Sequence, residues 1–190
     1  MMRYATVILA FLVAAVTGAY ADEAGLAALK AGGHVAIIRH AKTAPGVGDP
    51  RGFKLEDCAT QRNLIDEGRE EARRLGRLLR EQGVQVDRVL SAEWCRAQET
   101  AALIGAGTVE KEPALNDLYG RPQNRPAQIE ALRKLIAAWK GPGTLLLVTH
   151  GSITGALLGI NPETSAGVVL APAPETEDGF RVAGRIGPEG

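Results

Sequence analysis

The hydrophobic positions of the chain follow two different periods. Residues 35–38 and 144–149 are short runs that are apolar on both faces of an extended chain. Such runs are typical of strands in the middle of a parallel sheet that is covered by helices. Residues 66–82 instead repeat their apolar positions every three or four residues, with Arg and Glu between them. This second period predicts a helix with one buried and one solvated face.

Strands and helices are expected to alternate along most of the chain. In chain order, the pattern predicts a helix over 24–31, a strand over 34–39, a helix over 66–82, a strand over 86–91, a helix from a cap at Ser91 to 104, a helix from Pro126 to 140, a strand over 144–149, a helix from 152, and weaker strands over 167–171 and 180–185. Segments 44–57 and 110–125 are predicted to be connections. We expect Asp66 to cap the second helix and Gly83 to end it. The alternation predicts an α/β fold, a three-layer α/β/α sandwich with a mainly parallel sheet and no internal repeat.

Residues 1–21 have a different composition from the rest of the chain. Arg3 is followed by an almost wholly apolar stretch and then by Ala19-Tyr20-Ala21, a pattern typical of a secretory signal peptide. The alternative is a membrane anchor, but the apolar run is shorter than the roughly 20 residues that span a bilayer. We therefore expect cleavage after Ala21, no stable membrane insertion afterwards, and a single periplasmic or secreted domain over 22–190.

The overall charge excludes one class of partner. The chain has 22 basic and 22 acidic residues, and 4% of its residues are aromatic. A general nucleic-acid binder would carry a basic excess, and a base-stacking surface would need more aromatic side chains. No nucleic-acid partner is therefore expected.

Both cysteines lie after the predicted leader. In an oxidising compartment the even pair Cys58 and Cys95 favours a disulfide, and two buried reduced thiols are the alternative. Neither fits a catalytic cysteine of the phosphatase type, which needs an arginine further downstream around a phosphate-binding loop. Here Arg62 follows Cys58 by four positions, and Arg96 follows Cys95 directly.

Charged and imidazole side chains follow the predicted strands at the ends where sites form in parallel sheets. Arg39 and His40 end one strand, His150 follows another, and Arg96 comes shortly after a third. Two guanidiniums and two imidazoles repel one another unless an anion joins them, and the planar fork of arginine suits phosphate. Two helix starts next to these strands would add backbone N–H donors. The sequence therefore predicts a phosphate pocket at this edge of the sheet.

A metal site is a poorer interpretation of the same residues. The chain has three histidines, and His34 precedes His40 on the same strand, which places it ~20 Å away at the opposite end. We assign His34 a structural or surface role. No metal and no cofactor are expected.

Four segments in order resemble the motifs of the histidine phosphatase superfamily, also called phosphoglycerate-mutase-like. They are "IIRHAKT", "QRNLIDEGREEARRLG", "VLSAEWCRAQETA" and "LLLVTHGSITGAL". The resemblance covers nearly the whole chain after the leader, and its small branch fits better than the acid-phosphatase and phytase branch. It implies a mechanism in which His40 attacks phosphorus and water hydrolyses the phosphohistidine. Arg39, Arg96 and His150 would bind the phosphoryl oxygens, and the arginines would lower the pKa of His40.

The general acid is less sharply defined by this resemblance. "LNDLYG" resembles the family segment Leu-Asn-Glu, which places Asp117 where the family usually has glutamate. Glu99 and Glu112 are the alternatives, and an ordinary loop carboxylate is the alternative role for Asp117 itself.

Three further positions are interpreted through the same motifs. Thr43 and Arg62 match motif positions, so both are expected to help bind phosphate, although Arg62 is equally well explained as a surface arginine. Ala41 replaces the commoner glycine, and we expect the pocket to tolerate it unless that backbone needs a positive φ. A disulfide between Cys58 and Cys95 would tie the 44–60 loop to the helix that carries Arg96.

The main functional prediction is an exported phosphomonoesterase that needs no metal. A phosphomutase and a non-catalytic phosphate-binding or partner-binding member of the fold are the alternatives. The predicted partner is a small-molecule phosphate ester; small exported relatives weakly favour a sugar or envelope phosphate.

Overall fold

The computed structural model describes residues 21–188. The predicted leader, residues 1–21, lies outside this range except for its last residue, Ala21. None of the helices within residues 21–188 is both long and apolar enough to span a bilayer.

A six-stranded mixed sheet forms the middle layer, in the order β3-β2-β4-β1-β5-β6. The strands are β1 (Val35–Arg39), β2 (Val86–Ser91), β3 (Val109–Lys111), β4 (Thr144–Thr149), β5 (Gly167–Pro172) and β6 (Phe180–Ile186). The four strands from β3 to β1 pair in parallel, whereas β5 pairs antiparallel with β1 and β6 continues antiparallel beyond β5, at the edge of the sheet. The expected mainly parallel sheet is confirmed.

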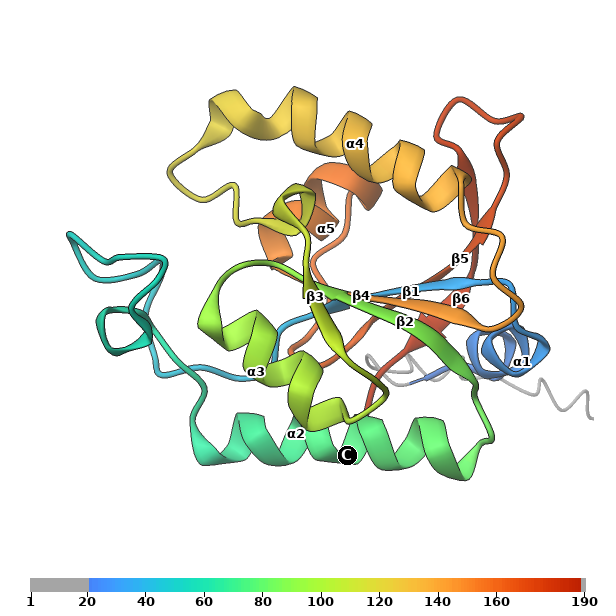
Figure 1. The fold of residues 1–190 in the computed structure, drawn as a ribbon, viewed down its shortest axis with the longest axis horizontal. Helices are drawn as coiled ribbons and strands as arrows, with labels where there is room; N and C mark the ends of the chain where they lie inside the picture. Colours follow the sequence, from blue (N-terminus) through green and yellow to red (C-terminus); the bar gives the residue numbers. More distant parts are fainter. Residues whose placement is uncertain (1–20, 189–190) are drawn as a thin grey trace, which may run out of the picture.

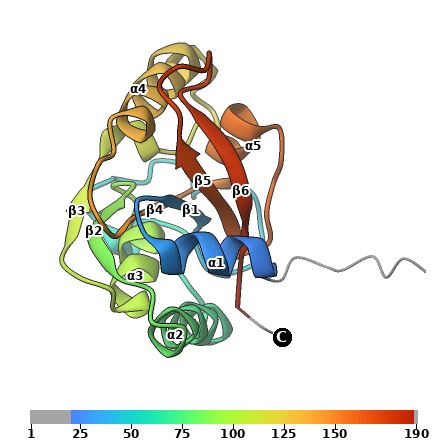
Figure 2. The same cartoon turned by 90° about the vertical axis from the view of Figure 1, so that its right-hand side faces the viewer.

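Helices cover both faces of this sheet (Figure 1). They are α1 (Glu23–Ala31), α2 (Asp66–Glu81), α3 (Cys95–Ile104), α4 (Arg125–Ala137) and α5 (Gly151–Leu158), with short 3-10 helices η1 (Cys58–Thr60), η2 (Pro113–Leu115) and η3 (Pro122–Asn124). Figure 2 shows α4 and α5 on one face and α2 and α3 on the other, while α1 packs beside β6. The three-layer α/β/α sandwich predicted from the sequence is therefore present.

The sheet register brings the two predicted active-site strands to the same level. Arg39 at the end of β1 pairs with Thr149 at the end of β4, so His40 and His150 follow at neighbouring positions. The backbone N–H of His40 donates to the carbonyl of Thr149, which holds the first residue after β1 against β4. Close packing also constrains this region, because a Cβ at Gly167 would lie 1.9 Å from the carbonyl oxygen of Ile37.

Several predicted boundaries were wrong by a few residues. We expected Asp66 to cap α2, but the cap position is Ile65 and Asp66 is the first helical residue. The side chain of Asp66 accepts a hydrogen bond from Arg69. Ser91 belongs to β2 because it pairs with β4, so α3 begins only at Cys95, after Trp94.

Two elements also differ in extent from the prediction. Helix α4 ends at Ala137, where we expected it to reach 140. The three-residue strand β3 was not predicted, since it is too short to show an alternating pattern.

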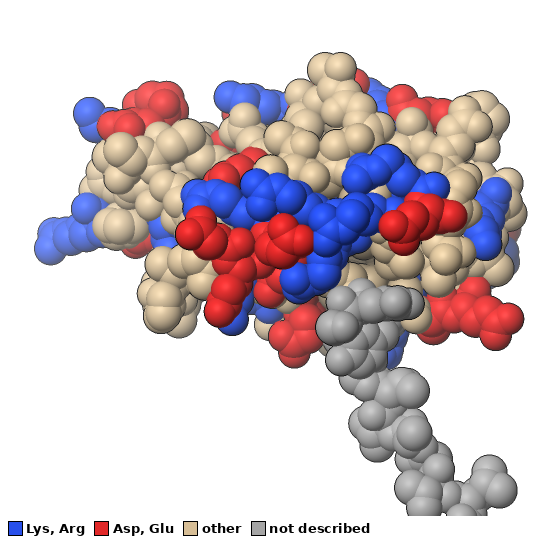
Figure 3. Space-filling model, turned by 90° about the horizontal axis from the view of Figure 1, so that it is seen from below, with Lys and Arg blue, Asp and Glu red and all other residues tan. Residues whose placement is uncertain are grey.

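Helix α2 shows the solvated face expected from its period. From below, basic and acidic side chains are interspersed along this side of the molecule (Figure 3). Glu70 pairs with both Arg73 and Arg77, and Arg69 pairs with Asp66. These pairs balance the charge along the helix, so this face lacks the basic excess that would attract a polyanion.

Candidate active site

His40 is buried at the carboxyl end of β1. Its side chain is 4% exposed, and its Nδ1 lies 2.8 Å from the carbonyl oxygen of Ala41. A carbonyl can only accept, so Nδ1 carries the proton and Nε2 keeps its lone pair. The pKa of His40 is lowered to about 3, first by burial and then by the charge of Arg96. The charges of Arg39 and Arg62 lower this pKa as well, whereas the hydrogen bond to Ala41 raises it. The ring is therefore neutral and nucleophilic at physiological pH.

Ala41 fits its position without strain. It is buried, its backbone has no positive φ, and its N–H donates to Thr100 Oγ1 at 2.9 Å. Alanine is therefore tolerated where the family usually has glycine.

His150 lies beside His40 and begins α5 as its cap residue. The two imidazole centroids are 5.2 Å apart in an edge-on arrangement, and the ring of Trp94 lies 5.4 Å from that of His150. Burial, followed by the charges of His40 and the neighbouring arginines, lowers the pKa of His150 well below its usual value.

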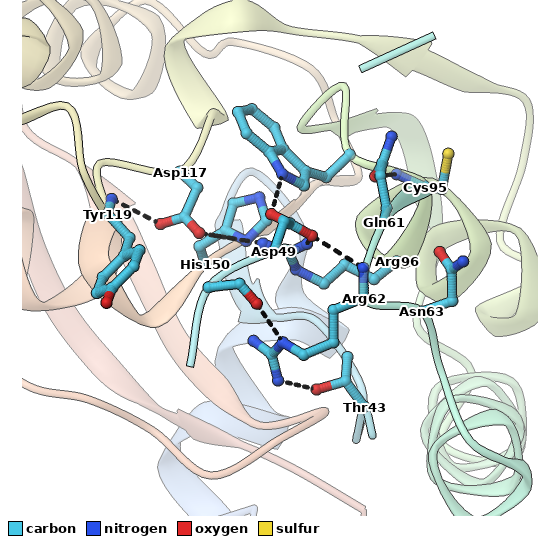
Figure 4. A network of polar contacts seen from close by, with 12 residues as sticks. Thr43, Asp49, Gln61, Arg62, Asn63, Cys95, Arg96, Asp117, Tyr119 and His150 are labelled. Carbon is cyan, nitrogen blue, oxygen red and sulfur yellow. Dashed lines mark hydrogen bonds and ion pairs between the residues drawn. The ribbon is translucent and has the colours of Figure 1, made fainter. Parts of the chain in front are cut away.

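Arg96 projects from the first turn of α3 and is fully buried. Its Nη1 donates to Asp49 at 2.8 Å and its Nη2 donates to Asp117 at 3.0 Å, so the guanidinium bridges two carboxylates (Figure 4). The coulombic attraction of two carboxylates offsets the cost of burying this cation.

Several nitrogens of this cluster have no hydrogen-bond partner among the described residues. They are Nε of Arg39, Nε of Arg96, and both ring nitrogens of His150. Arg39 is otherwise held by a bond from its Nη1 to the carbonyl of Pro162 at 2.9 Å. Buried donors without partners are costly, and an anionic oxygen would satisfy them.

Asp117 is buried beside Arg96 and His150. One oxygen contacts Arg96 and is 3.8 Å from Nδ1 of His150. The other oxygen accepts bonds from the hydroxyl of Ser152 at 2.6 Å and the backbone N–H of Tyr119 at 3.0 Å. Asp117 therefore belongs to the cluster.

The two alternatives to Asp117 have other partners. Glu99 pairs with Arg69 at 2.7 Å on the surface of α3, and Glu112 caps η2 through the N–H of Ala114. Neither makes a hydrogen bond or ion pair with the histidines or with Arg96.

Asp49 was not among the residues predicted from the sequence. Its carboxylate accepts bonds from Arg96, from Nε1 of Trp94 at 2.8 Å and from the backbone N–H of Arg62 at 3.0 Å (Figure 4). Burial alone would raise the pKa of Asp49, but these hydrogen bonds and the charge of Arg96 lower it. No local signal marks this residue, which is one acid in a glycine- and proline-rich loop.

Thr43 and Arg62 form hydrogen bonds that fix the loop containing Asp49. The Arg62 guanidinium donates to Thr43 Oγ1 and to the carbonyl of Gly48, the latter at 2.9 Å. Arg62 also contributes to lowering the pKa of both His40 and His150, so its charge acts on the cluster.

The predicted disulfide is present. Cys58 at the start of η1 is bonded to Cys95, the first residue of α3, with an S–S distance of 1.99 Å. The adjoining Gln61 side chain accepts from the backbone N–H of Cys95 at 3.0 Å. The loop before α2 is therefore attached to the helix that carries Arg96. We expected the backbone N–H groups at the start of this helix to bind phosphate, but the N–H of Cys95 already donates to Gln61.

Comparisons with known proteins agree with this architecture. Residues 35–140, more than half of the chain, match the profile of the histidine phosphatase superfamily, branch 1; His150 lies beyond the matched segment. No curated protein matches the chain.

Solved structures share the fold at low identity. The protein histidine phosphatase SixA complexed with tungstate has a TM-score of 0.58 and 21% identity, over 82% of this chain and 97% of that one. A protein from Escherichia coli K-12 described as a putative alpha-ribazole-5′-P phosphatase has a TM-score of 0.57 and 18% identity, over 82% and 96%. The protein TTHB049 from Thermus thermophilus has a TM-score of 0.53 and 19% identity, over 81% and 99%.

The profile match covers β1 with the His40 that follows it, the segment of Arg62 and the helix of Arg96, in the fold that these relatives share. The chain belongs to the histidine phosphatase superfamily, branch 1.

Proposed function

We propose that the protein is an exported phosphomonoesterase that works through a phosphohistidine at His40 and needs no metal. The observation that carries this proposal is the set of buried, unpartnered nitrogens on Arg39, Arg96 and His150 around a neutral imidazole. A phosphoryl group has three oxygens that would accept from them, and its phosphorus would then face the lone pair of His40.

In the first step, Nε2 of His40 attacks phosphorus and the ester P–O bond breaks. The electron pair of that bond goes to the leaving oxygen, which takes a proton from Asp117. The Asp117 carboxylate gains this proton from the monoanionic ester when the phosphoryl oxygens replace it at Arg96, and the departing phosphate takes it back at the end of the cycle. The phosphorylated ring keeps its Nδ1 proton, and the carbonyl of Ala41 stabilises the positive charge that develops there.

In the second step, water attacks the phosphohistidine and gives its proton to the Asp117 carboxylate. The P–N bond breaks and its electron pair returns to Nε2, which restores the neutral imidazole. Arg39, Arg96 and His150 donate to the phosphoryl oxygens while charge shifts in both transition states.

Turnover of an aryl phosphate in EDTA tests this proposal. The protein would be purified in its mature form from a bacterium that exports it, beside His40→Ala and His34→Ala. His34 is a matched control because it precedes β1 at the other end of the sheet, where its ring bonds to the carbonyl of Gly32. We expect turnover by the native protein and His34→Ala, no turnover by His40→Ala, and a phosphoenzyme that survives an alkaline quench.

Other outcomes would change the assignment. Movement of the phosphoryl group to another hydroxyl of the same substrate skeleton, without release of free phosphate, would make the enzyme a mutase. Phosphate binding without turnover from acidic to neutral pH would favour a non-catalytic member of the fold.

Export is supported by the leader pattern and by the disulfide, because disulfides persist mainly outside the cytoplasm. The intact mass of the exported protein should correspond to a chain that begins at Asp22. A mass that retains residues 1–21 would contradict cleavage.

A further inference from the structure

Two cavities open at the outer side of the cluster. One has a volume of about 320 Å³ and the other about 340 Å³, and both are lined by Phe53, Asp117 and Arg121. Trp94, whose ring contacts that of His150, lines the second cavity. A phosphoryl group held by Arg39, Arg96 and His150 would place its leaving oxygen near Asp117 and its leaving group in these cavities.

Arg121 occupies an unusual position between the two cavities. Its guanidinium carbon lies 5.1 Å from the ring centroid of Trp94 and 5.4 Å from that of Phe53. The side chain is half-buried, and within residues 21–188 it forms no ion pair with a carboxylate. Among the same residues, its guanidinium makes a single hydrogen bond, a long one of 3.4 Å to the carbonyl of Tyr119.

This arrangement orients a cation without using up its donors. Stacking on aromatic rings occupies the faces of a guanidinium, whereas its N–H groups project in its plane and stay available to an anion. The acidic residues in the walls of the two cavities, Asp49 and Asp117, both pair with Arg96. Arg51 lines the first cavity as well and adds a second positive charge.

We propose that Arg121 forms a subsite for an anionic substituent on the leaving group, so that the preferred substrates carry a second negative charge besides the phosphoryl group. The proposal rests on the proposed phosphomonoesterase function, because it assigns the leaving-group side of that site. Arg121 is then a specificity-determining residue, and the stacked rings of Phe53 and Trp94 position it.

Matched aryl esters test the subsite. The probes are 4-carboxyphenyl phosphate and its neutral isostere 4-carbamoylphenyl phosphate, compared in the native protein, Arg121→Gln and Arg125→Gln. Arg125 is the matched control, since it is an exposed arginine four residues away that lines neither cavity. The readout is the ratio of kcat/KM for the carboxy ester to kcat/KM for the carbamoyl ester.

We expect this ratio to fall by about fivefold or more in Arg121→Gln, as loss of a partly buried charge-assisted contact predicts, and to stay unchanged in Arg125→Gln. An equal ratio in the native protein and Arg121→Gln would overturn the subsite, whatever the absolute rates.

Binding keeps this test independent of turnover. Calorimetry with His40→Ala measures the dissociation constants of both uncleaved esters, with and without Arg121→Gln. If the native protein hydrolyses neither ester, the proposed function fails, but a Kd ratio that depends on Arg121 still supports the subsite. Absence of binding of both esters, or a ratio indifferent to Arg121, refutes it.

Discussion

Asp49→Asn should destabilise the protein, although it changes a single loop residue. The carboxylate accepts three hydrogen bonds, from Arg96, Trp94 and Arg62, and its side chain is only 5% exposed. An amide oxygen can accept two of these bonds, and the amide nitrogen would then face the third donor.

The size of the effect follows from two losses. One buried donor left without an acceptor costs about 1–3 kcal/mol. Removing one partner of a buried ion pair costs about 3–5 kcal/mol, but Arg96 keeps Asp117, so the smaller end applies. The donor without an acceptor is Nε1 of Trp94, which faces the second oxygen, whereas Arg96 keeps a bond to the amide oxygen and loses only the charge. Because the loss at Arg96 is partial, we expect a fall of roughly 2–4 kcal/mol in the free energy of unfolding, and of roughly 5–15 °C in Tm for a domain of this size.

Urea denaturation at pH 7 measures this difference, with Asp57→Asn as the control. Asp57 lies in the same loop, but its exposed carboxylate accepts only from Ala59 as a cap, a role that asparagine fills equally well. A loss in Asp49→Asn within about 0.5 kcal/mol of that in Asp57→Asn would refute the reasoning.

Inorganic phosphate provides a second arm of the same experiment. Because Asp49 occupies Nη1 of Arg96 and carries a negative charge, its neutralisation should strengthen phosphate binding. Added phosphate should therefore raise the stability of Asp49→Asn more than that of the native protein. Equal stabilisation of the two would mean that Asp49 and phosphate do not compete for Arg96.

Three further predictions concern stability. Below pH 6.5 the unfolded imidazole of His40 takes up a proton that the buried ring, with its pKa of about 3, does not, so this residue should reduce stability by up to about 1.4 kcal/mol for each pH unit lost. Urea midpoints from pH 7 to pH 4 should show a flatter dependence in His40→Gln, and an unchanged slope would contradict the buried neutral ring. Replacing both Cys58 and Cys95 by serine should cost about 3–4 kcal/mol, the chain-entropy value for a separation of 37 residues; a thermal melt unaffected by this change would argue against the disulfide as a major constraint. Gly167→Ala should lower Tm clearly, because its new Cβ would lie 1.9 Å from a backbone oxygen of β1, whereas Gly155→Ala in α5 should be neutral or stabilising; similar melts for both variants would show that β5 can shift.

The layers of the fold could be predicted because their signals are local. Apolar runs on both faces marked β1 and β4, and the helical period marked α2, since each pattern needs only neighbouring residues. Boundaries were less secure: Ser91 has the chemistry of a helix cap, but pairing with β4 keeps it in a strand. The edge strand β3 depends on its pairing with β2, which no local pattern reveals.

The sequence by itself determined the main members of the site. Arg39, His40 and His150 lie at the carboxyl ends of parallel strands. All such strand ends meet at one edge of the sheet, so their meeting could be predicted without knowledge of the loops. The parity of the cysteines, together with the predicted leader, similarly favoured the disulfide that the structure contains.

Only the tertiary structure decided which side chains contact Arg96 and Arg121 around the histidines. Asp49 reaches Arg96 across 47 positions of sequence, and Arg121 reaches Trp94 from a separate loop. These contacts depend on where two irregular loops settle on the finished sheet. Loop conformation lacks the repeating period that makes strands and helices predictable, so the partners of Arg96 and Arg121 emerge only when the whole chain has packed.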